Sequence, residues 1–343
     1  MTVYVISFTD NGDLLNKKIC RIFKNCNIKS FPHTFKRDNL KKWTENAFAD
    51  ADAIIFIGAA GIAVRAIASY IDRKDKDPAV VVCDELGKYA VPILSGHIGG
   101  GNDIALKIEQ GTSAKAVITT ATDINGVWAV DNWAVKKNFK IANIENVKYI
   151  SSALLRGEQI GLFSDVEIDE NLPKNVVPGK LGANSGIVIS PYKKKVYGYT
   201  LNLIPKCLSI GVGSKKNADE NALIDLFEKI FRKNKLDKYS VSNIATIDLK
   251  KNEPAILKLQ EYLNVELKYF TSDELNKVYG EFSKSEFVKS TTGTDNVCEK
   301  CAVLASDFGK KIIPKSIGDG VTLSVGLRGE VPKSETLDGG DKL

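Results

Sequence analysis

The stretch AIIFIGAAGIAVR, residues 53–65, decides the fold class of this chain. Its first five residues are apolar and predict a short buried strand, and the segment from Gly58 to Gly61 supplies a turn. An apolar pattern with helical spacing follows and extends to Ile71. Strand, glycine turn and helix in this order form the corner at which α/β proteins often bind ligands.

The same alternation of short apolar strands and amphipathic helices recurs almost throughout the chain, which predicts an α/β fold with mostly parallel sheets. In the first part we expect strands at residues 3–8, 79–83 and 116–119, and helices at 12–23 and from Asn102 or Asp103, as N-cap, to Gln110. In the last part we expect strands at 207–212, 244–247, 265–270 and 322–325, and helices at 218–231, 254–263 and 296–308.

Between these parts the pattern of the sequence changes. Residues 140–205 hold few long helical patterns and several turn signals, and they end in two strand-like runs at 186–190 and 195–203. We therefore predict two α/β units, residues 1–135 and 206–327, joined by a smaller middle region, residues 136–205. Residues 328–343 have no periodicity and predict a loose tail.

The composition is that of an ordinary globular protein, with 43% hydrophobic and 26% charged residues in a chain of 343. No apolar run is long enough to span a bilayer, and residues 3–8 are too short for a signal-peptide core, so we expect a cytoplasmic protein with no membrane partner. The six cysteines are too sparse for a disulfide framework.

The net charge of +6 comes from lysines that are spread over the whole sequence. A nucleic-acid-binding surface would cluster them, so no nucleic-acid partner is predicted. A positive field suits a polyanionic small substrate. A lysine-rich proteome would explain the same excess.

The densest group of candidate functional residues is LSGHIGGGND, residues 94–103. His97 is suited to proton transfer near neutral pH, and the glycines around it let the backbone approach a ligand. A histidine tied into a turn is the alternative interpretation. His33 has no comparable neighbours, and we interpret it as a surface residue.

Other polar residues end predicted strands, where α/β sheets present their ligand-facing loops. Asp84 and Glu85 follow one strand, and a carboxylate there could act as a base, orient His97 or cap a turn. Thr120, Thr122 and Asp123 follow another and could bond an oxygen-rich ligand. Asp131 precedes a helical stretch and is predicted as its N-cap.

Two glycine corners could hold carboxylates through backbone amides and a nearby cation. One contains Gly58, Gly61 and Arg65; the other is GVGSKK, residues 211–216, with Gly211, Gly213 and Lys215. Neither contains a phosphate-binding fingerprint, which disfavours a nucleotide-dependent oxidoreductase. Cys298 and Cys301 form a single Cys-x-x-Cys motif within a predicted helix. Because no second pair of ligands accompanies it, no metal site is predicted.

At these residues the chain resembles the cobalamin-biosynthesis family CbiG, the cobalt-precorrin-5A hydrolases of the anaerobic corrin pathway. The matching segments are FIGAAGIAVR (56–65), DPAVVVCDE (77–85), LSGHIGG (94–100) with Asn102, and ITTATD (118–123), followed by IGVG (210–213), IATID (244–248), EP (253–254), VCEKCA (297–302) and PK (314–315). The resemblance covers residues 50–326 and is weakest in the middle.

The resemblance implies that water opens the δ-lactone between the ring A acetate and C20 of cobalt-precorrin-5A. The C20 carbon and its methyl group then leave as acetaldehyde, giving cobalt-precorrin-5B. It implies no cofactor of the protein, because the cobalt travels with the corrinoid substrate. Lactone opening needs an activated water and stabilisation of an oxyanion.

We therefore expect His97 to act as general base, with Asp84 or Glu85 orienting it and the amides of Gly99, Gly100 and Gly101 stabilising the oxyanion. The substrate-binding residues that we expect are Gly58, Gly61, Arg65, Ser95, Gly99, Gly100, Gly101, Asn102, Thr120, Thr122, Asp123, Gly211, Gly213 and Lys215. A cleft between the two α/β units would hold the macrocycle. The alternative is a non-catalytic carrier of corrinoid intermediates that uses the same corners without proton chemistry. The sequence leaves open which carboxylate assists His97 and which α/β unit holds the reacting edge of the macrocycle. It also leaves open whether the enzyme assists the loss of acetaldehyde and whether the protein forms a homodimer.

Overall fold

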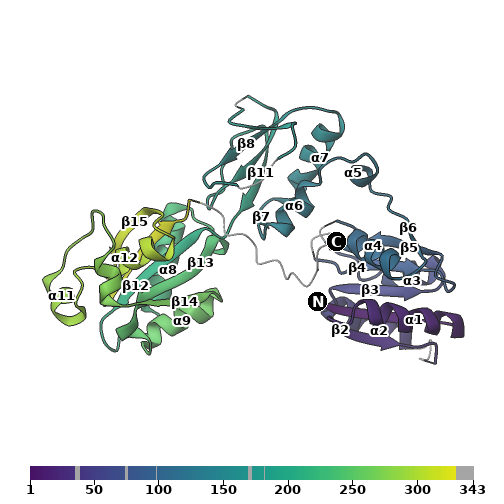
Figure 1. Cartoon of the computed structure of the whole chain (residues 1–343), viewed down its shortest axis with the longest axis horizontal. Coiled ribbons are helices and arrows are strands. Elements are labelled where there is room, and N and C mark those ends of the chain that lie inside the picture. The colour runs from purple at the N-terminus through teal and green to yellow at the C-terminus, as the bar shows by residue number, and fades with distance from the viewer. Residues whose placement is uncertain (35–38, 74–75, 98, 169–171, 181, 330–343) are drawn as a thin grey trace. The chain divides into compact units, whose positions relative to one another are not determined.

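The computed structural model describes residues 1–34, 39–73, 76–97, 99–168, 172–180 and 182–329. The chain divides into two compact units, Met1–Asn132 and Trp133–Leu343. The first unit holds one sheet and the second holds two (Figure 1). Most strand pairs are parallel and helices alternate with strands, which confirms the predicted α/β class.

The sheet of the first unit has the strand order β2-β1-β3-β4-β5-β6. Its pairs are parallel except β4 with β5, which run antiparallel. The strands are β1 (Thr2–Ser7), β2 (Asn27–Phe31), β3 (Ala53–Ile57), β4 (Ala79–Cys83), β5 (Tyr89–Leu94) and β6 (Lys115–Ala116).

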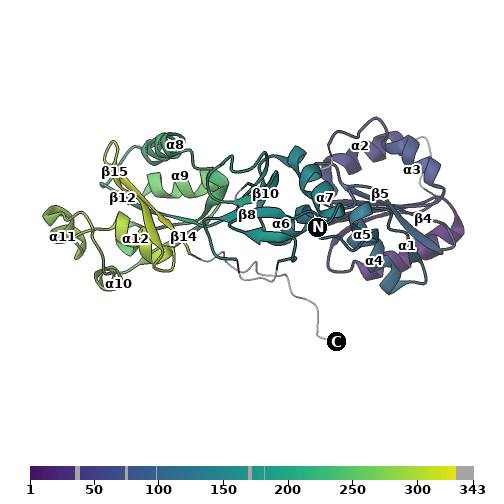
Figure 2. The same ribbon diagram turned by 90° about the horizontal axis from the view of Figure 1, so that it is seen from above.

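Helices cover both faces of this sheet (Figure 2). On one face α1 (Asp10–Ile22) and α4 (Gly101–Gly111) bury Leu15, Ile19 and Ile108 against alternate residues of β1, β3 and β4. On the other face α2 (Leu40–Asp50) and α3 (Ala60–Ile67) bury Trp43 and Ile67. Strands apolar on both faces follow from this double coverage. The short helix α5 (Ala121–Ile124) follows β6, and α6 (Val130–Lys136) follows it.

The second unit begins with a small sheet of order β7-β11-β10-β8-β9. Its elements are β7 (Lys140–Ile141), α7 (Val147–Leu155), β8 (Ile160–Ser164), β9 (Val176–Pro178), β10 (Ser185–Ile189) and β11 (Tyr199–Ile204). Only β7 is antiparallel to its neighbour. The middle region is thus an α/β layer with its own sheet, and the sequence did not predict β8 or α7.

The last sheet has the order β14-β13-β12-β16-β15, with β16 antiparallel to both neighbours. It contains β12 (Leu208–Ser214), β13 (Val241–Ile247), β14 (Glu266–Phe270), β15 (Lys310–Ile317) and β16 (Val321–Leu327). Helices α8 (Ala222–Asn234) and α9 (Pro254–Leu263) lie on one face and α12 (Cys298–Ala305) on the other, with α10 (Ser272–Asn276) and α11 (Glu286–Thr292) beside α12 (Figure 2).

Several predicted bounds differ from the observed ones. The strand expected at residues 116–119 pairs only at Lys115 and Ala116. The helix that follows the turn at Gly58–Gly61 was expected to extend to Ile71 but ends at Ile67. Helix α8 starts at Ala222 because the preceding turn is closed by Asp219, whose carboxylate accepts from the Asn221 amide.

Arg328, expected in the loose tail, is held in place. Its backbone N–H donates to the Cys207 carbonyl, and its guanidinium lies 2.9 Å from the Asp307 carboxylate. Residues 330–343 lie outside the described part of the chain. Within the described ranges, no helix has the length and apolarity needed to cross a membrane.

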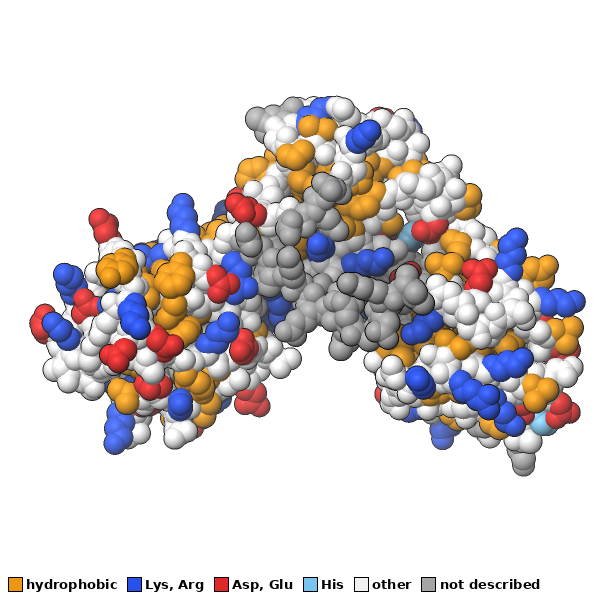
Figure 3. All heavy atoms as spheres, viewed as in Figure 1, with side chains coloured by type: hydrophobic (Ala, Val, Ile, Leu, Met, Phe, Trp, Pro, Cys, Tyr) orange, Lys and Arg blue, Asp and Glu red, His pale blue; other side chains and the backbone are white. Residues whose placement is uncertain are grey.

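Lysine and arginine side chains are distributed over the visible face of both units, interleaved with acidic and apolar side chains (Figure 3). This distribution matches the even spread of lysines along the sequence.

Tyr197 crosses two glycines of the middle sheet. A Cβ atom added to Gly186 would lie 2.3 Å from the Tyr197 ring, and one added to Gly161 would lie 2.4 Å from it. The ring is buried, yet its hydroxyl has no hydrogen-bond partner in the described structure. Ring packing rather than the hydroxyl is therefore what this residue contributes.

We predict that Gly186→Ala lowers the free energy of unfolding by about 1–3 kcal/mol, because the added methyl group overpacks a filled site. Tyr197→Phe should retain or raise stability, since it removes an unpaired buried hydroxyl. Urea unfolding of the two variants checks this. A Tyr197→Phe variant less stable than Gly186→Ala would contradict it.

Glu299 on α12 is the centre of a buried polar cluster in the last α/β layer. Its carboxylate accepts from the Ser283 amide and hydroxyl, Asn296 Nδ2, the Lys311 ammonium and the Lys315 amide. Burial, the largest single influence, raises the pKa of this carboxyl, but these donors together outweigh it and lower the pKa to about 2.

A depressed carboxyl pKa stabilises the fold above its ordinary value of 4.5 and loses that effect as the pH falls toward 2. Glu299→Gln should therefore lower the free energy of unfolding by about 3 kcal/mol at neutral pH. The difference in free energy of unfolding between wild type and Glu299→Gln should narrow below pH 4.5. Glu266→Gln, at a largely exposed position, is the control and should cost less than about 1 kcal/mol. A stability difference that stays constant as the pH falls below 4.5 would contradict the lowered pKa of Glu299.

Candidate active site

The loop between β5 and α4 carries His97 and depends on its glycines. A Cβ atom on Gly99 would lie 2.4 Å from the Ser95 Cβ and 2.8 Å from its carbonyl oxygen. One on Gly96 would lie 2.8 Å from Asn102 Oδ1. Gly100 has φ 80° and is the N-cap of α4, so neither Asn102 nor Asp103 is the N-cap that we predicted. The glycines make the loop tight enough to close over Asn102.

Asp123 is the residue where this loop meets the segment after β6. The buried Asn102 side chain donates from Nδ2 to Asp123 Oδ2 at 2.8 Å and to Thr120 Oγ1 at 3.0 Å. The Thr120 hydroxyl also donates to Asp123 Oδ2. One carboxylate oxygen thus accepts hydrogen bonds from α4 and from the turn before α5, and these bonds fix its position.

His97 lies against the same carboxylate. Its Nε2 is 3.6 Å from Asp123 Oδ2 and 2.9 Å from the Thr122 hydroxyl, and its Nδ1 is 3.1 Å from Asn132 Nδ2. The His97 and Asp123 side chains are 18% and 36% exposed. Both ring nitrogens are therefore positioned by polar groups while the site stays open to a ligand.

The carboxylates predicted to orient His97 are engaged elsewhere. Asp84 accepts from the amides of Leu86, Lys88 and Tyr89, which caps its own turn. Glu85 accepts from the Thr9 hydroxyl at 2.7 Å. The structure corrects the prediction: the carboxylate beside His97 is Asp123.

Two of the three amides predicted to stabilise an oxyanion are also engaged. The Gly100 amide donates to the His97 carbonyl and the Gly101 amide donates to the Ser95 carbonyl. Both bonds close the loop, so these amides serve its shape. Ser95, expected to bind substrate, has φ 52°, and its buried hydroxyl has no hydrogen-bond partner among the described residues. Such strain often occurs at functional sites.

The first glycine corner forms as predicted, between β3 and α3, but Arg65 folds back over it. The guanidinium nitrogens lie 3.5 Å from the Cβ position of Gly61. A Cβ on Gly58 would lie 2.9 Å from the Phe8 ring. Gly58 therefore admits Phe8, and Arg65 occupies the space above Gly61.

The second corner is not a turn. Gly211 and Gly213 lie inside β12 and pair with β16, Gly211 opposite Ser324 and Gly213 opposite Thr322. A Cβ on Gly211 would lie 1.8 Å from the Cys298 carbonyl oxygen, so Gly211 is required for α12 to pack on the sheet. Gly213 and Lys215 line a cavity of the second unit, described below.

Three family models match this chain in succession. The cobalamin synthesis G N-terminal model covers residues 42–123, the cobalamin biosynthesis central region 128–205, and the cobalamin synthesis G C-terminus 208–326. The cobalt-precorrin-5A hydrolase of Salmonella typhimurium is 31% identical over 82% of this chain and 83% of its own. The chain belongs to the cobalamin synthesis G family.

A second relative and a solved structure are also similar to this chain. The cobalt-precorrin-5A hydrolase of Priestia megaterium is 26% identical over 94% of both chains. A crystal structure described as a putative cobalamin biosynthesis protein G homolog from Sulfolobus solfataricus is 24% identical, covers 95% of this chain and 97% of its own, and has a TM-score of 0.42.

Asn132 is a residue of the candidate site that the sequence analysis did not predict. It lies in α6, 35 positions after His97, and its amide contacts His97 Nδ1. Asp131, predicted as the N-cap, lies inside the first turn of the same helix. Two adjacent polar residues at a helix start were the available signal. In the part of the chain that is described, no three His, Cys, Asp or Glu side chains group as metal ligands would.

We predict that Gly99→Ala lowers the free energy of unfolding by about 1–3 kcal/mol, because the new methyl group collides with Ser95 backbone atoms. Gly100→Asn is the matched control. Its Cβ meets open space, and asparagine tolerates both the positive φ and the N-cap position. Thermal unfolding of the two variants measures the difference; equal losses would contradict the loop geometry.

Proposed function

We propose that this chain is a cobalt-precorrin-5A hydrolase that opens the ring A lactone and releases acetaldehyde. The observation that carries the proposal is His97 held by Thr122, Asn132 and Asp123 in a chain of this family. A positioned imidazole next to a carboxylate can serve as the general base that activates water for lactone hydrolysis.

His97 supplies the base through Nδ1. The Asn132 amide N–H donates, so Nδ1 is the acceptor and the neutral ring carries its proton on Nε2, facing Thr122 and Asp123. A water that displaces the Asn132 amide can then transfer a proton to Nδ1. Its oxygen forms the new bond to the lactone carbonyl carbon.

Asp123 stabilises the imidazolium that this transfer creates. At 3.6 Å from Nε2 its carboxylate provides the opposite charge, and Asn102 and Thr120 hold it there. Asn102 and Thr120 are thus positioning residues, whereas Thr122, whose hydroxyl contacts Nε2 directly, can relay a proton.

The same proton completes the reaction. The tetrahedral intermediate collapses with cleavage of the acyl–oxygen bond, leaving an alkoxide on C20. That alkoxide becomes the acetaldehyde carbonyl as the bond from C20 to the ring breaks, and its electron pair stays on the ring carbon. The ring carbon takes the proton held by His97, which restores the base. One water is consumed, and no electron is exchanged with a cofactor.

The cobalt enters as part of the substrate, so the proposal includes no resident cofactor. We also propose a cytoplasmic enzyme that acts on a free corrinoid, with neither nucleic acid nor membrane as partner. The six cysteines are all free thiols, which supports a reducing compartment.

We predict that His97→Ala lowers kcat for acetaldehyde release from cobalt-precorrin-5A by about 10²- to 10⁴-fold, because the proton acceptor is lost. Asp123→Asn should lower kcat at least about tenfold by removing the charge that stabilises the imidazolium. Glu85→Gln tests the alternative carboxylate and should stay within about twofold of wild type. Coupled detection of acetaldehyde measures all three.

The opposite order, with Glu85→Gln impaired and Asp123→Asn active, would show that the loop rearranges around a different carboxylate. Wild-type activity in His97→Ala would rule out the proposed base. Circular dichroism confirms that each variant is folded before its rate is interpreted.

A further inference from the structure

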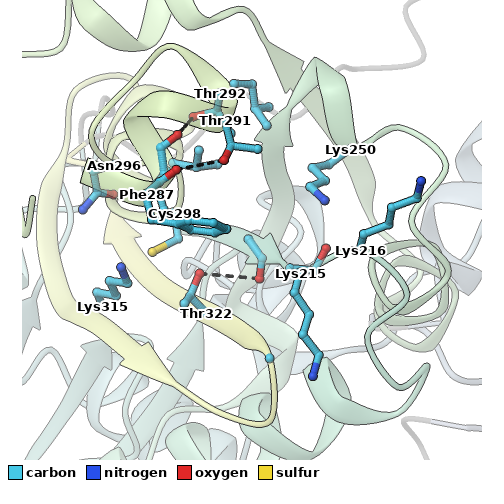
Figure 4. Close-up of a pocket in the computed structure, with 16 residues that line it drawn as sticks. Lys215, Lys216, Lys250, Phe287, Thr291, Thr292, Asn296, Cys298, Lys315 and Thr322 are labelled. Carbon is cyan, nitrogen blue, oxygen red and sulfur yellow. Dashed lines mark hydrogen bonds between the residues drawn. The ribbon is translucent and has the colours of Figure 1, made fainter. Parts of the chain in front are cut away.

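The second unit contains a cavity of about 330 Å³ at the carboxyl ends of β12 and β13. The residues that line it come from several separate segments, which Figure 4 shows: the end of β12, the turn after β13, helix α11, the start of α12 and strands β15 and β16. Ligands of open α/β sheets bind at this end of the strands. The hydrolytic mechanism above uses none of these residues.

The centre of the cavity is apolar. Ile247 and Cys298 are buried in its wall, and Phe287 of α11 lines it although 79% of that side chain is exposed. Figure 4 shows Phe287 and Cys298 in the middle of the labelled residues. An exposed phenylalanine on a cavity wall offers a planar surface that a flat ligand could cover.

The rim is basic. Lys215, Lys216, Lys250 and Lys315 line the cavity, and among the residues that the structure describes no aspartate or glutamate lines it. Lys250 is paired with Glu253 at 2.8 Å. In the described part of the chain, the ammonium groups of the other three make no hydrogen bond or ion pair. These three charges are available to an anion.

Neighbouring buried bonds fix the backbone beneath these lysines. The Lys315 amide donates to Glu299, which also holds Asn296 of the cavity wall. The Lys215 amide donates to the Gly320 carbonyl. These bonds fix the backbone at Lys215 and Lys315, so a ligand that binds there need order their side chains rather than this backbone.

Covalent chemistry at Cys298 does not fit the site. Burial raises the pKa of its thiol to about 11, so near neutral pH the sulfur is protonated and contributes apolar surface. The site combines shape, a planar contact and positive charge, which are properties of a binding site.

We propose that this cavity binds one edge of a polycarboxylate tetrapyrrole, with a ring over Phe287 and acetate or propionate groups at Lys215, Lys216 and Lys315. The volume suits a single pyrrole-derived ring with its substituents, not the entire macrocycle. The inference rests on the proposed function for the identity of its ligand. It adds a binding site on the second unit, separate from the residues assigned to catalysis on the first.

Uroporphyrin III, a tetrapyrrole with acetate and propionate groups at its edge, is the probe. Its binding to the full chain is measured by fluorescence titration at fixed salt. Lys315→Gln should weaken binding about tenfold through loss of a charge-assisted hydrogen bond. Phe287→Ala should weaken it about fivefold through loss of ring contact. Lys310→Gln, on the same strand but outside the cavity lining, is the matched control and should stay within about twofold.

His97→Ala separates this site from catalysis. It should bind uroporphyrin III like wild type while acetaldehyde release is lost. Affinities unchanged by both Lys315→Gln and Phe287→Ala, in a chain that still hydrolyses cobalt-precorrin-5A, would overturn the site and leave the hydrolase intact. Cavity-dependent binding in a wild-type chain that releases no acetaldehyde would support the site and refute the hydrolase, as expected of a carrier. Displacement of the probe by equimolar ATP would overturn the tetrapyrrole assignment in favour of a general anion site.

Discussion

The carboxylate of Asp123 is the interaction on which the candidate active site depends. Asn102 and Thr120 hold one of its oxygens, and that oxygen faces His97. Asn102 can reach it only because the loop before α4 closes through Gly96 and Gly99, where side chains would collide. The glycines, the amide and the carboxylate thus form one unit whose result is the orientation of an imidazole. The proposed proton transfer at His97 depends on that orientation.

Local signals predicted much of the fold. The helix at Pro254–Leu263 was predicted with its observed bounds, because proline starts a helix readily and the apolar spacing continues to Leu263. The strands at Ala53–Ile57 and Ala79–Cys83 were equally clear, since burial on both faces leaves an unbroken apolar run. The middle sheet was not predicted in full: β8 contains a glycine that accommodates Tyr197, a distant contact that no local pattern encodes.

The residues of the candidate site were predicted better than their arrangement. His97, Asn102, Thr120, Thr122 and Asp123 were all named, and the structure brings them together. The pairing was wrong because Asp84 and Glu85 end a strand, as ligand-facing residues do, yet cap a turn and bind Thr9. Gly211 was misjudged for a similar reason, since a glycine needed for helix packing looks the same in sequence as one needed for a ligand.

Chemical rescue tests most directly whether the imidazole of His97 is the proton acceptor. Acetaldehyde release by His97→Ala is measured with increasing imidazole at several pH values. The account predicts that imidazole restores turnover and that the restored rate follows the concentration of its free base. Asp123 and Asn132 still line the space that the histidine ring leaves, so imidazole can bind there. Substantial turnover that is independent of imidazole concentration would contradict it.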